Sequence, residues 1–326
     1  MAENPNPEIR IDEINNAIAH YADQRYPQGK DPKDCLADLQ TKLQVFKIHA
    51  QRLGATRAFE LFSIYRMADR IVEKRLSNKG EPDDPITVNL HRAAARLAQH
   101  RNILVVSDMD GTITEGAVVN GVYTPGTAYM NLIPGRLLAD KLEGQGFTKE
   151  EIMILAYYYP LTQYPHIMRA GAEHVRIRPG LEEFIEHLIG SGGCFEVLSA
   201  NFQPFVDGVL DKINRRADIR KVTSVRDDNI SSIAKAQHLH IASAENPDSL
   251  LVFVGDGRSD IEALEAYDVV GWWYALKDQV FHHALQEKDV IHFPYQTFHD
   301  ITKNEKQIFD LSLDYRELTQ SDIAQL

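Results

Sequence analysis

The first hundred residues carry apolar side chains at helical spacing. Apolar residues recur every three or four positions over residues 36–46 and again over residues 58–71, which is the period of one face of a helix. The stretch 77–85 contains glycine, prolines and several charged residues and predicts a break in the helical pattern. A further helix is expected over about 87–99. We therefore predict three or four packed helices over residues 11–100.

From Ile103 onward, the pattern changes to short, continuous apolar runs that alternate with helical segments. Runs of this kind are typical of strands buried on both faces. Alternating strands and helices predict an α/β fold, in which a parallel sheet carries helices on both faces and binds ligands beyond the carboxyl ends of its strands. The expected strands are 103–106, 195–198, 222–225, 250–254 and 269–272, and the expected helices are 181–189, 230–238 and 261–266.

Residues 117–178 interrupt this alternation directly after the first strand. Asn120 and Gly121 stand between β-forming residues, which predicts a hairpin. Two helical patterns follow, over about 135–143 and 149–158. Because the insertion follows the first strand, we expect it to overhang the carboxyl end of that strand.

These patterns divide the chain into two predicted domains. Residues 1–100 form a helical domain without a recognisable catalytic motif, and residues 101–326 form an α/β catalytic domain with the insertion at about 117–178. The last segment, from Gln296, is expected to be a surface extension that contains a helix.

Composition and charge narrow the function classes. The chain has 326 residues, 44% hydrophobic and 25% charged, which is typical of a globular protein and not of a disordered one. Its formal net charge of −12 disfavours general nucleic-acid binding, because a negative surface repels phosphate backbones. Cys35 and Cys194 lie far apart, which argues against a disulfide framework or a zinc site. No secretory signal and no membrane-spanning apolar stretch are visible, so a cytoplasmic protein is expected.

Polar residues gather in four clusters, of which three follow expected strands and one lies in an expected helix. Ligands of parallel sheets bind beyond the carboxyl ends of the strands, so we expect the clusters to form one site. They are DMDGT at 108–112, LSAN at 198–201, Lys235, and GDGRSD at 255–260.

Chemically, these clusters suit phosphoryl transfer. Three carboxylates, Asp108, Asp110 and Asp256, would repel one another when ionised, and a hard divalent cation such as Mg²⁺ relieves that repulsion because it prefers oxygen ligands. A cation beside Lys235 and the Ser199 hydroxyl would receive a phosphoryl group and neutralise its charge. A carboxylate at the centre can act as a nucleophile and form an acyl phosphate.

The four clusters resemble the four motifs of the haloacid dehalogenase superfamily. DMDGT resembles the first motif, DxDGT, and GDGRSD resembles the GDGxxD form of the fourth. Ser199, after an apolar strand, resembles the second motif, and Lys235 resembles the third. The resemblance covers about residues 102–294 and implies a Rossmann-like parallel sheet with a small helical cap of the C1 class, formed by the insertion.

The resemblance also implies a role for each matched residue. Asp108 would be the nucleophile, and Asp110 would be the general acid for the leaving group and then the general base for water. Mg²⁺ would be held by the Asp108 carboxylate, the Asp110 backbone carbonyl and Asp256. The remaining matched residues would bind phosphate or support its ligands: Ser199, Ala200, Gly111 and Lys235 at the phosphate, with Asp260 steadying Lys235 or a metal-bound water.

Within the superfamily, residues 178–206 are similar to phosphoserine phosphatase and its relatives. Those enzymes carry Gly-Gly after the motif serine, whereas this chain has Ala200 and Asn201. The substrate is therefore left open by the sequence. Candidates for substrate contact in and beside the insertion are Glu115, Arg136 and Arg176.

The function expected from these observations is a Mg²⁺-dependent phosphatase that hydrolyses a small phosphorylated metabolite through an aspartyl-phosphate intermediate. Two alternatives stay open: a phosphotransferase or mutase that uses the same intermediate, and a non-catalytic interaction protein that acts through its N-terminal helices. We expect no nucleic-acid or membrane partner. The apolar stripes of the N-terminal helices must be buried against something, and a homodimer through these helices is one candidate.

Overall fold

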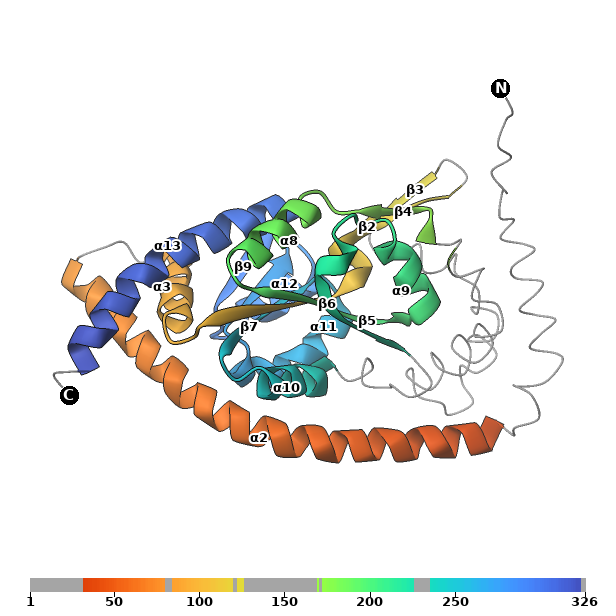
Figure 1. The fold of residues 1–326 in the computed structure, drawn as a ribbon, viewed down its shortest axis with the longest axis horizontal. Helices are drawn as coiled ribbons and strands as arrows, with labels where there is room; N and C mark the ends of the chain where they lie inside the picture. Colours follow the sequence, from red (N-terminus) through yellow and green to blue (C-terminus); the bar gives the residue numbers. More distant parts are fainter. Residues whose placement is uncertain are drawn as a thin grey trace, which may run out of the picture.

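The computed structural model describes residues 32–79, 84–119, 122–125, 169, 172–225 and 235–323. Its centre is a six-stranded sheet in the order β6-β5-β1-β7-β8-β9 (Figure 1). Every neighbouring pair in this sheet is parallel, as the sequence predicts. The strands are β1 (Asn102–Ser107), β5 (Cys194–Phe202), β6 (Ile219–Val225), β7 (Ser249–Gly255), β8 (Trp272–Leu276) and β9 (His292–Tyr295).

Strand β1 lies inside the sheet, between β5 and β7. Its apolar run from Ile103 to Val106 is buried, and Val105 aligns with Phe195 on one side and Val252 on the other. Such a strand is buried on both faces, which explains its continuous apolar run. The same register brings the carboxyl ends of β1, β5 and β7 to one edge of the sheet.

Helices cover both faces of the sheet (Figure 1). On one side α13 contacts α3 and α8, and on the other side α10 contacts both the long helix α2 and the 3-10 segment η7. The expected α/β fold is therefore confirmed. The helices are α2 (Pro32–Lys79), α3 (Pro85–Leu97), α8 (Leu181–Gly190), α9 (Gln203–Leu210), α10 (Lys235–Glu245), α11 (Arg258–Ile261), α12 (Val280–Gln286) and α13 (Phe298–Ile323), and the 3-10 segments are η5 (Arg216–Asp218) and η7 (Glu262–Val269).

A second, smaller sheet follows β1. It has the order β3-β2-β4, with β2 (Thr114–Val119), β3 (Val122–Pro125) and β4 (Val175–Ile177). Strands β2 and β3 are antiparallel, and Val118 pairs with Tyr123, so the hairpin predicted around Asn-Gly is confirmed. Nearly all of the chain between β3 and β4 lies outside the described residues, and the two helical patterns expected there fall in that part.

Three expectations about the C-terminal part are corrected. The strand expected at 269–272 begins only at Trp272, because Val269 ends η7 and the apolar run does not separate a buried turn from a strand. Strand β9 was not expected, since it has only four residues and contains a proline. The segment after Gln296 is more than a surface extension, because α13 buries several side chains in the main core. They are Phe298, Ile301, Ile308 and Tyr315.

The helices before β1 share the core of the sheet. Both apolar runs of the N-terminal segment lie in the single helix α2, which buries Leu61, Tyr65 and Ala68 in the same cluster as the strands. Helix α3 begins at Pro85 after Asp84, whose carboxylate accepts a hydrogen bond from the Thr87 backbone N–H, as a helix cap does. Residues 11–31 lie outside the described residues, and the domain division at residue 100 stays a prediction.

Candidate active site

The carboxyl ends of β1, β5 and β7 bring together the clusters at 108–112, 198–201 and 255–260. The remaining cluster, Lys235, is the first residue of α10 and joins them. Asp108 follows β1 directly, and its backbone N–H donates to the Val254 carbonyl of β7 at 2.8 Å. This bond fixes the start of the first cluster beside the strand that leads into Asp256. Ser199 lies within β5, and Lys235 opens α10.

The turn after Asp108 depends on a glycine. Gly111 has φ of +83°, a left-handed conformation that L side chains rarely adopt. A Cβ at this position would lie 2.1 Å from a carboxylate oxygen of Asp256, so close approach demands glycine as well. The next residue, Thr112, donates its hydroxyl to Asp256 at 3.2 Å and to Asp108 at 3.5 Å. The turn therefore packs directly on the fourth cluster.

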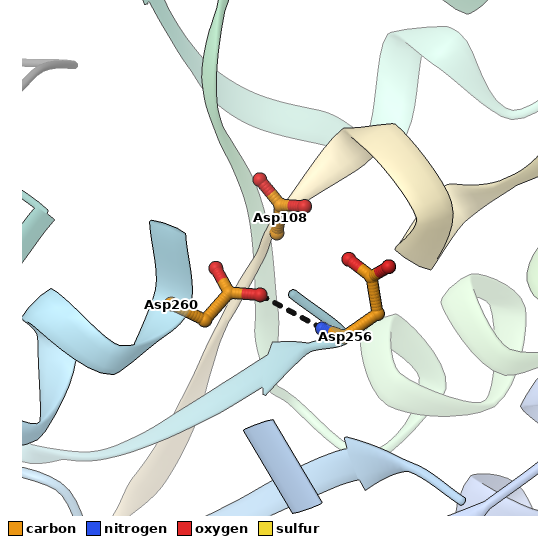
Figure 2. Close-up of side chains that lie close together, drawn as sticks. All are labelled: Asp108, Asp256 and Asp260. Atoms are coloured by element: carbon orange, nitrogen blue, oxygen red, sulfur yellow. Dashed lines mark hydrogen bonds between the residues drawn. The ribbon is translucent and has the colours of Figure 1, made fainter. Parts of the chain in front are cut away.

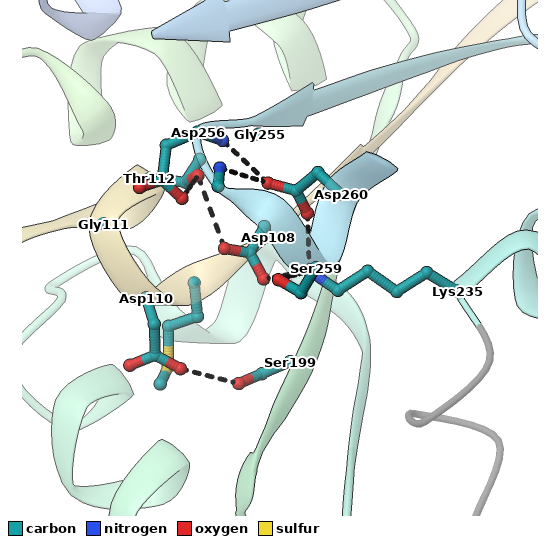
Figure 3. Close-up of polar contacts among 12 residues, drawn as sticks. Asp108, Asp110, Gly111, Thr112, Ser199, Lys235, Gly255, Asp256, Ser259 and Asp260 are labelled. Carbon is teal, nitrogen blue, oxygen red and sulfur yellow. Dashed lines mark hydrogen bonds and ion pairs between the residues drawn. The ribbon is translucent and has the colours of Figure 1, made fainter. Parts of the chain in front are cut away.

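Lys235 lies between two carboxylates (Figure 3). Its ammonium is 2.6 Å from an oxygen of Asp108 and 2.6 Å from an oxygen of Asp260, and it also donates to Ser259 at 3.3 Å. The side chain of Lys235 is only 1% exposed, so these contacts are sheltered from water. Charge pairs in such surroundings interact more strongly than pairs at the surface. Lys235 is thus the centre of the cluster.

Three carboxylates gather at the ends of β1 and β7 (Figure 2). Asp108, Asp256 and Asp260 each offer an oxygen within 4.8 Å of the others, and all three residues are buried. Asp260 also accepts hydrogen bonds from the backbone N–H groups of Asp256 at 2.8 Å and Gly257 at 2.9 Å. These bonds, with Lys235, balance the charge of Asp260 and orient the loop that carries Asp256.

The second carboxylate of the first cluster, Asp110, has separate partners. An oxygen of Asp110 accepts a hydrogen bond from the Ser199 hydroxyl at 3.2 Å. The side-chain amide of Asn201 donates to both oxygens of Asp110, at 3.2 and 3.3 Å. The Asn201 backbone N–H in turn donates to the Ser199 oxygen at 3.0 Å. Asp108 and Asp110 therefore face different groups, as two carboxylates with different roles require.

Burial and mutual repulsion shift the pKa values of this cluster. Burial raises the pKa of Asp256 to about 7, and the charge of Asp260 adds to the effect. Burial also raises the pKa of Asp108, which Lys235 opposes and Asp260 reinforces. Burial alone would lower the pKa of Lys235, but the charges of Asp108 and Asp260 outweigh it and raise the pKa. Lys235 stays protonated, and its single positive charge faces three carboxyl groups.

This shortage of positive charge makes the site suited to a divalent cation. Asp108, Asp256 and Asp260 offer carboxylate oxygens, which are ligands that Mg²⁺ prefers. Three buried carboxylates gather around the single ammonium of Lys235, and burial, together with the charge of Asp260, raises the pKa of Asp256. A divalent cation would supply the missing charge, so the residues fit the predicted Mg²⁺ site. The prediction that Asp108 and Asp256, with the backbone carbonyl of Asp110, would hold the ion stays a prediction.

The remaining predicted residues divide into three groups. Gly111 and half-buried Ala200 lie beside the site as parts of the turn and of β5. Glu115 is half-buried in β2, and Arg176 is exposed in β4, both in the small sheet. Arg136 lies outside the described residues. Substrate contacts of Glu115, Arg136 and Arg176 therefore stay predictions.

Two residues with clear contacts at the site were not assigned a role from the sequence. Asn201 stood out only as a departure from the Gly-Gly of phosphoserine phosphatases, and the structure places its amide on Asp110. Thr112 is part of the first motif, but only the fold shows that it reaches Asp256, 144 residues further along the chain. The departure at Asn201 was the one sequence signal that could have pointed to its contact.

The comparison with known families agrees with the four clusters. Residues 105–265 match the family model of haloacid dehalogenase-like hydrolases, and this range includes all of the described site residues. These residues belong to the haloacid dehalogenase-like hydrolases. The expectation of a hydrolytic enzyme is thereby confirmed at the level of the family.

Individual relatives are distant. The 2-hydroxy-3-keto-5-methylthiopentenyl-1-phosphate phosphatase of Bacillus mycoides is 23% identical over 229 residues, covering 65% of this chain and all of that protein. A crystal structure of phosphoserine phosphatase in its apo form covers 62% of this chain and 98% of its own, at 16% identity and a TM-score of 0.42. A predicted phosphatase from Clostridium acetobutylicum covers 63% and 98%, at 16% identity and a TM-score of 0.45.

Proposed function

We propose that this hydrolase is a Mg²⁺-dependent phosphatase that hydrolyses a small phosphomonoester through an aspartyl phosphate on Asp108. The observation that carries the proposal is the separation of two carboxylates two residues apart. Asp108 lies 2.6 Å from the Lys235 ammonium, whereas Asp110 is hydrogen-bonded to Ser199 and Asn201. This separation supports Asp108 as the nucleophile beside a fixed positive charge and Asp110 as the acid or base beside it.

In the first step, a carboxylate oxygen of Asp108 attacks the phosphorus of the substrate. The bond between phosphorus and the leaving oxygen breaks, and Asp110 gives its proton to that oxygen. The product alcohol leaves, and an acyl phosphate remains on Asp108. Lys235 would offset the negative charge on the transferring group, since its ammonium already touches the attacking carboxylate.

In the second step, Asp110 takes a proton from water, and the water oxygen attacks the same phosphorus. The bond between phosphorus and Asp108 breaks, which releases inorganic phosphate, restores the carboxylate of Asp108 and leaves Asp110 protonated for the next cycle. When bound, the Mg²⁺ ion would neutralise charge between the carboxylates and the phosphoryl oxygens. The Ser199 hydroxyl, which donates to Asp110 in this structure, would bind a phosphoryl oxygen.

The family match and the name of the Bacillus mycoides relative both support phosphatase chemistry. They do not extend to the substrate, since fold and function are separable and the insertion at 117–178 is expected to set specificity. A small phosphorylated metabolite is the proposed substrate class. A homodimer through the N-terminal helices and a cytoplasmic location stay predictions from the sequence. Among the described residues, none of the helices combines the length and the apolar character that crossing a bilayer requires.

A panel of phosphorylated metabolites, assayed with Mg²⁺ for free phosphate, tests the proposal. We expect phosphate release from at least one compound, with no release by the Asp108→Asn variant. Trapping a radiolabelled phosphoryl group on the protein should succeed for the wild type and fail for this variant. Transfer of the group to a second metabolite instead of water would support the phosphotransferase alternative. No release and no transfer across the panel would favour the interaction protein.

A further inference from the structure

Arg178 follows directly after β4, at the point where the insertion returns to the catalytic sheet. Its side chain is buried, with the residue 8% exposed. A buried guanidinium must find acceptors for its N–H groups, because an unpaired charge in such a place is costly. The acceptors of the Arg178 side chain are all backbone carbonyl groups.

Arg178 binds four consecutive backbone carbonyls, from Gly111 to Thr114, at the end of the turn that follows Asp108. The guanidinium Nε donates to the Thr112 carbonyl at 2.7 Å, and Nη2 donates to the carbonyls of Gly111 and of Thr114, the latter at 3.4 Å. The backbone N–H of Arg178 donates to the Ile113 carbonyl at 2.7 Å. Arg178 thus holds the end of the turn that places Asp108 against Asp256, and the start of β2 that follows it.

The same side chain also reaches the segment that supports the fourth cluster. Its Nη1 donates to the Gln296 carbonyl at 2.9 Å, after the end of β9. The guanidinium lies 5.9 Å from the ring centre of Tyr295, whose hydroxyl is 3.5 Å from the Gly255 carbonyl, next to Asp256. Arg178 therefore connects the loop that carries the nucleophile to the strand end beside the loop that carries Asp256.

We propose that Arg178 is a positioning residue that fixes the catalytic turn at residues 108–112 relative to Asp256, and thereby sets the geometry of the metal and phosphoryl site. This inference rests on the proposed function. The geometry is demanding, because Gly111 leaves no room for even a methyl group against Asp256. A small shift of the turn would change the distance between Asp108 and Asp256, on which binding of one cation by both depends. Because Arg178 follows β4 directly, it also links the end of the insertion to the turn that carries Asp108.

The guanidinium is needed for this task because of its shape. It carries five N–H donors in a planar fork and can bind several carbonyls at once. A lysine would offer donors from a single nitrogen, and a glutamine would keep neither the charge nor the reach. We therefore expect Arg178→Lys to preserve part of the geometry and Arg178→Gln to lose most of it.

Arg57 offers a matched control for these variants. It is also a buried arginine that donates to the backbone, with Nη2 at 2.8 Å from the Pro247 carbonyl, and it joins α2 to the region after α10. Arg57→Gln should reduce the free energy of unfolding as Arg178→Gln does, but it should not change the geometry of the active site. Comparing the two glutamine variants separates a loss of stability from a loss of site geometry.

The experiment measures four quantities on the full chain: thermal stability, Mn²⁺ affinity by electron paramagnetic resonance, and kcat and KM for the best substrate of the panel. We expect Arg178→Gln to reduce kcat by about 100-fold and Mn²⁺ affinity by about 10-fold. Arg178→Lys should fall between Arg178→Gln and the wild type in kcat and in Mn²⁺ affinity. Arg57→Gln should match the wild type in kcat and in Mn²⁺ affinity. Guanidinium ion, added below its unfolding concentration, should restore activity to Arg178→Ala but not to Asp108→Asn.

The possible outcomes distinguish this inference from the proposed function. A folded Arg178→Gln variant with wild-type kcat and wild-type Mn²⁺ affinity would overturn the inference and leave the phosphatase proposal standing. If the wild type releases no phosphate but binds Mn²⁺, and Arg178→Gln binds it more weakly, the positioning role stands and the phosphatase proposal fails. If the wild type neither binds Mn²⁺ nor releases phosphate, both fail.

Discussion

Thr112 and Asp256 are joined by a hydrogen bond of 3.2 Å, although 144 residues separate them in the chain. The bond links the turn of the first motif to the loop of the fourth. Together with Gly111, where a Cβ would meet the same carboxylate, it fixes how close the proposed nucleophile Asp108 comes to Asp256. The catalytic geometry thus depends on contacts between motifs as well as on the residues within each.

Replacement of Asp108 by asparagine should abolish turnover without loss of stability. An amide is a much poorer nucleophile, and we expect phosphate release to fall by at least about 1,000-fold. Because burial and neighbouring carboxylates raise the pKa of Asp108, the folded protein favours an uncharged group there in the absence of metal. The melting temperature of the metal-free variant should therefore equal or exceed that of the wild type. More than a few per cent of residual activity would contradict the nucleophile assignment.

Replacement of Gly111 by alanine should reduce activity far more than its backbone strain alone explains. The new methyl group would meet an Asp256 oxygen at 2.1 Å and displace it. Gly192→Ala is a matched control, since Gly192 has φ of +82° and its nearest neighbour would lie 4.0 Å away. Both variants should lose about 1 kcal/mol of stability from the left-handed conformation. Only Gly111→Ala should lose phosphate release and Mn²⁺ binding, and equal activities would contradict the close contact.

Removal of divalent metal by a chelator should abolish phosphate release, and added Mg²⁺ should restore it. Ca²⁺ should inhibit, because it accepts more oxygen ligands at longer distances and would engage both oxygens of Asp108. Asp256→Asn should raise the Mg²⁺ concentration needed for half-maximal activity by at least about 10-fold. Full activity after exhaustive chelation would rule out the metal role of Asp256.

Ionisation of the Glu305 carboxyl group should lower the free energy of unfolding as the pH rises. The Tyr274 hydroxyl donates to this buried carboxyl group at 2.9 Å, yet burial raises the pKa of Glu305 to about 7. The ordinary pKa of a glutamic acid is about 4.3, so between these values the folded state binds the proton more tightly than the unfolded state does. The contribution of protonated Glu305 to the free energy of unfolding is complete below pH ~4.3 and is lost as the pH rises through about 7. The loss amounts to roughly 3 kcal/mol.

Chemical unfolding of the wild type and Glu305→Gln at several pH values measures this effect. Glutamine keeps an acceptor for Tyr274 but does not ionise, so its stability should fall less steeply over this range. Saturating Mg²⁺ in both proteins keeps the titration of Asp256 out of the comparison. Parallel stability curves would show that Glu305 ionises freely in the folded protein.

Much of the fold follows from local sequence patterns. The continuous apolar runs predicted β1, β5, β6 and β7, because a strand buried on both faces has no polar side. The Asn-Gly pair predicted the hairpin of β2 and β3, since that turn type requires residues that tolerate positive φ. The errors lie where local patterns are ambiguous. The buried turn before β8 has the composition of a strand, and β9 is too short and too proline-disrupted to be recognised.

For the site, the sequence alone determined the chemical groups and their grouping into four motifs, three of them at the ends of buried strands and one in a helix. Only the tertiary structure decided which of these groups touch. The 2.6 Å contact of Lys235 with Asp108 spans 127 residues, and the guanidinium contact of Arg178 with the Thr112 carbonyl spans 66. No local pattern encodes such pairs, because they depend on strand order and register across the whole sheet. The motifs therefore fix the available chemistry, and the long-range packing of the sheet fixes the geometry in which that chemistry is arranged.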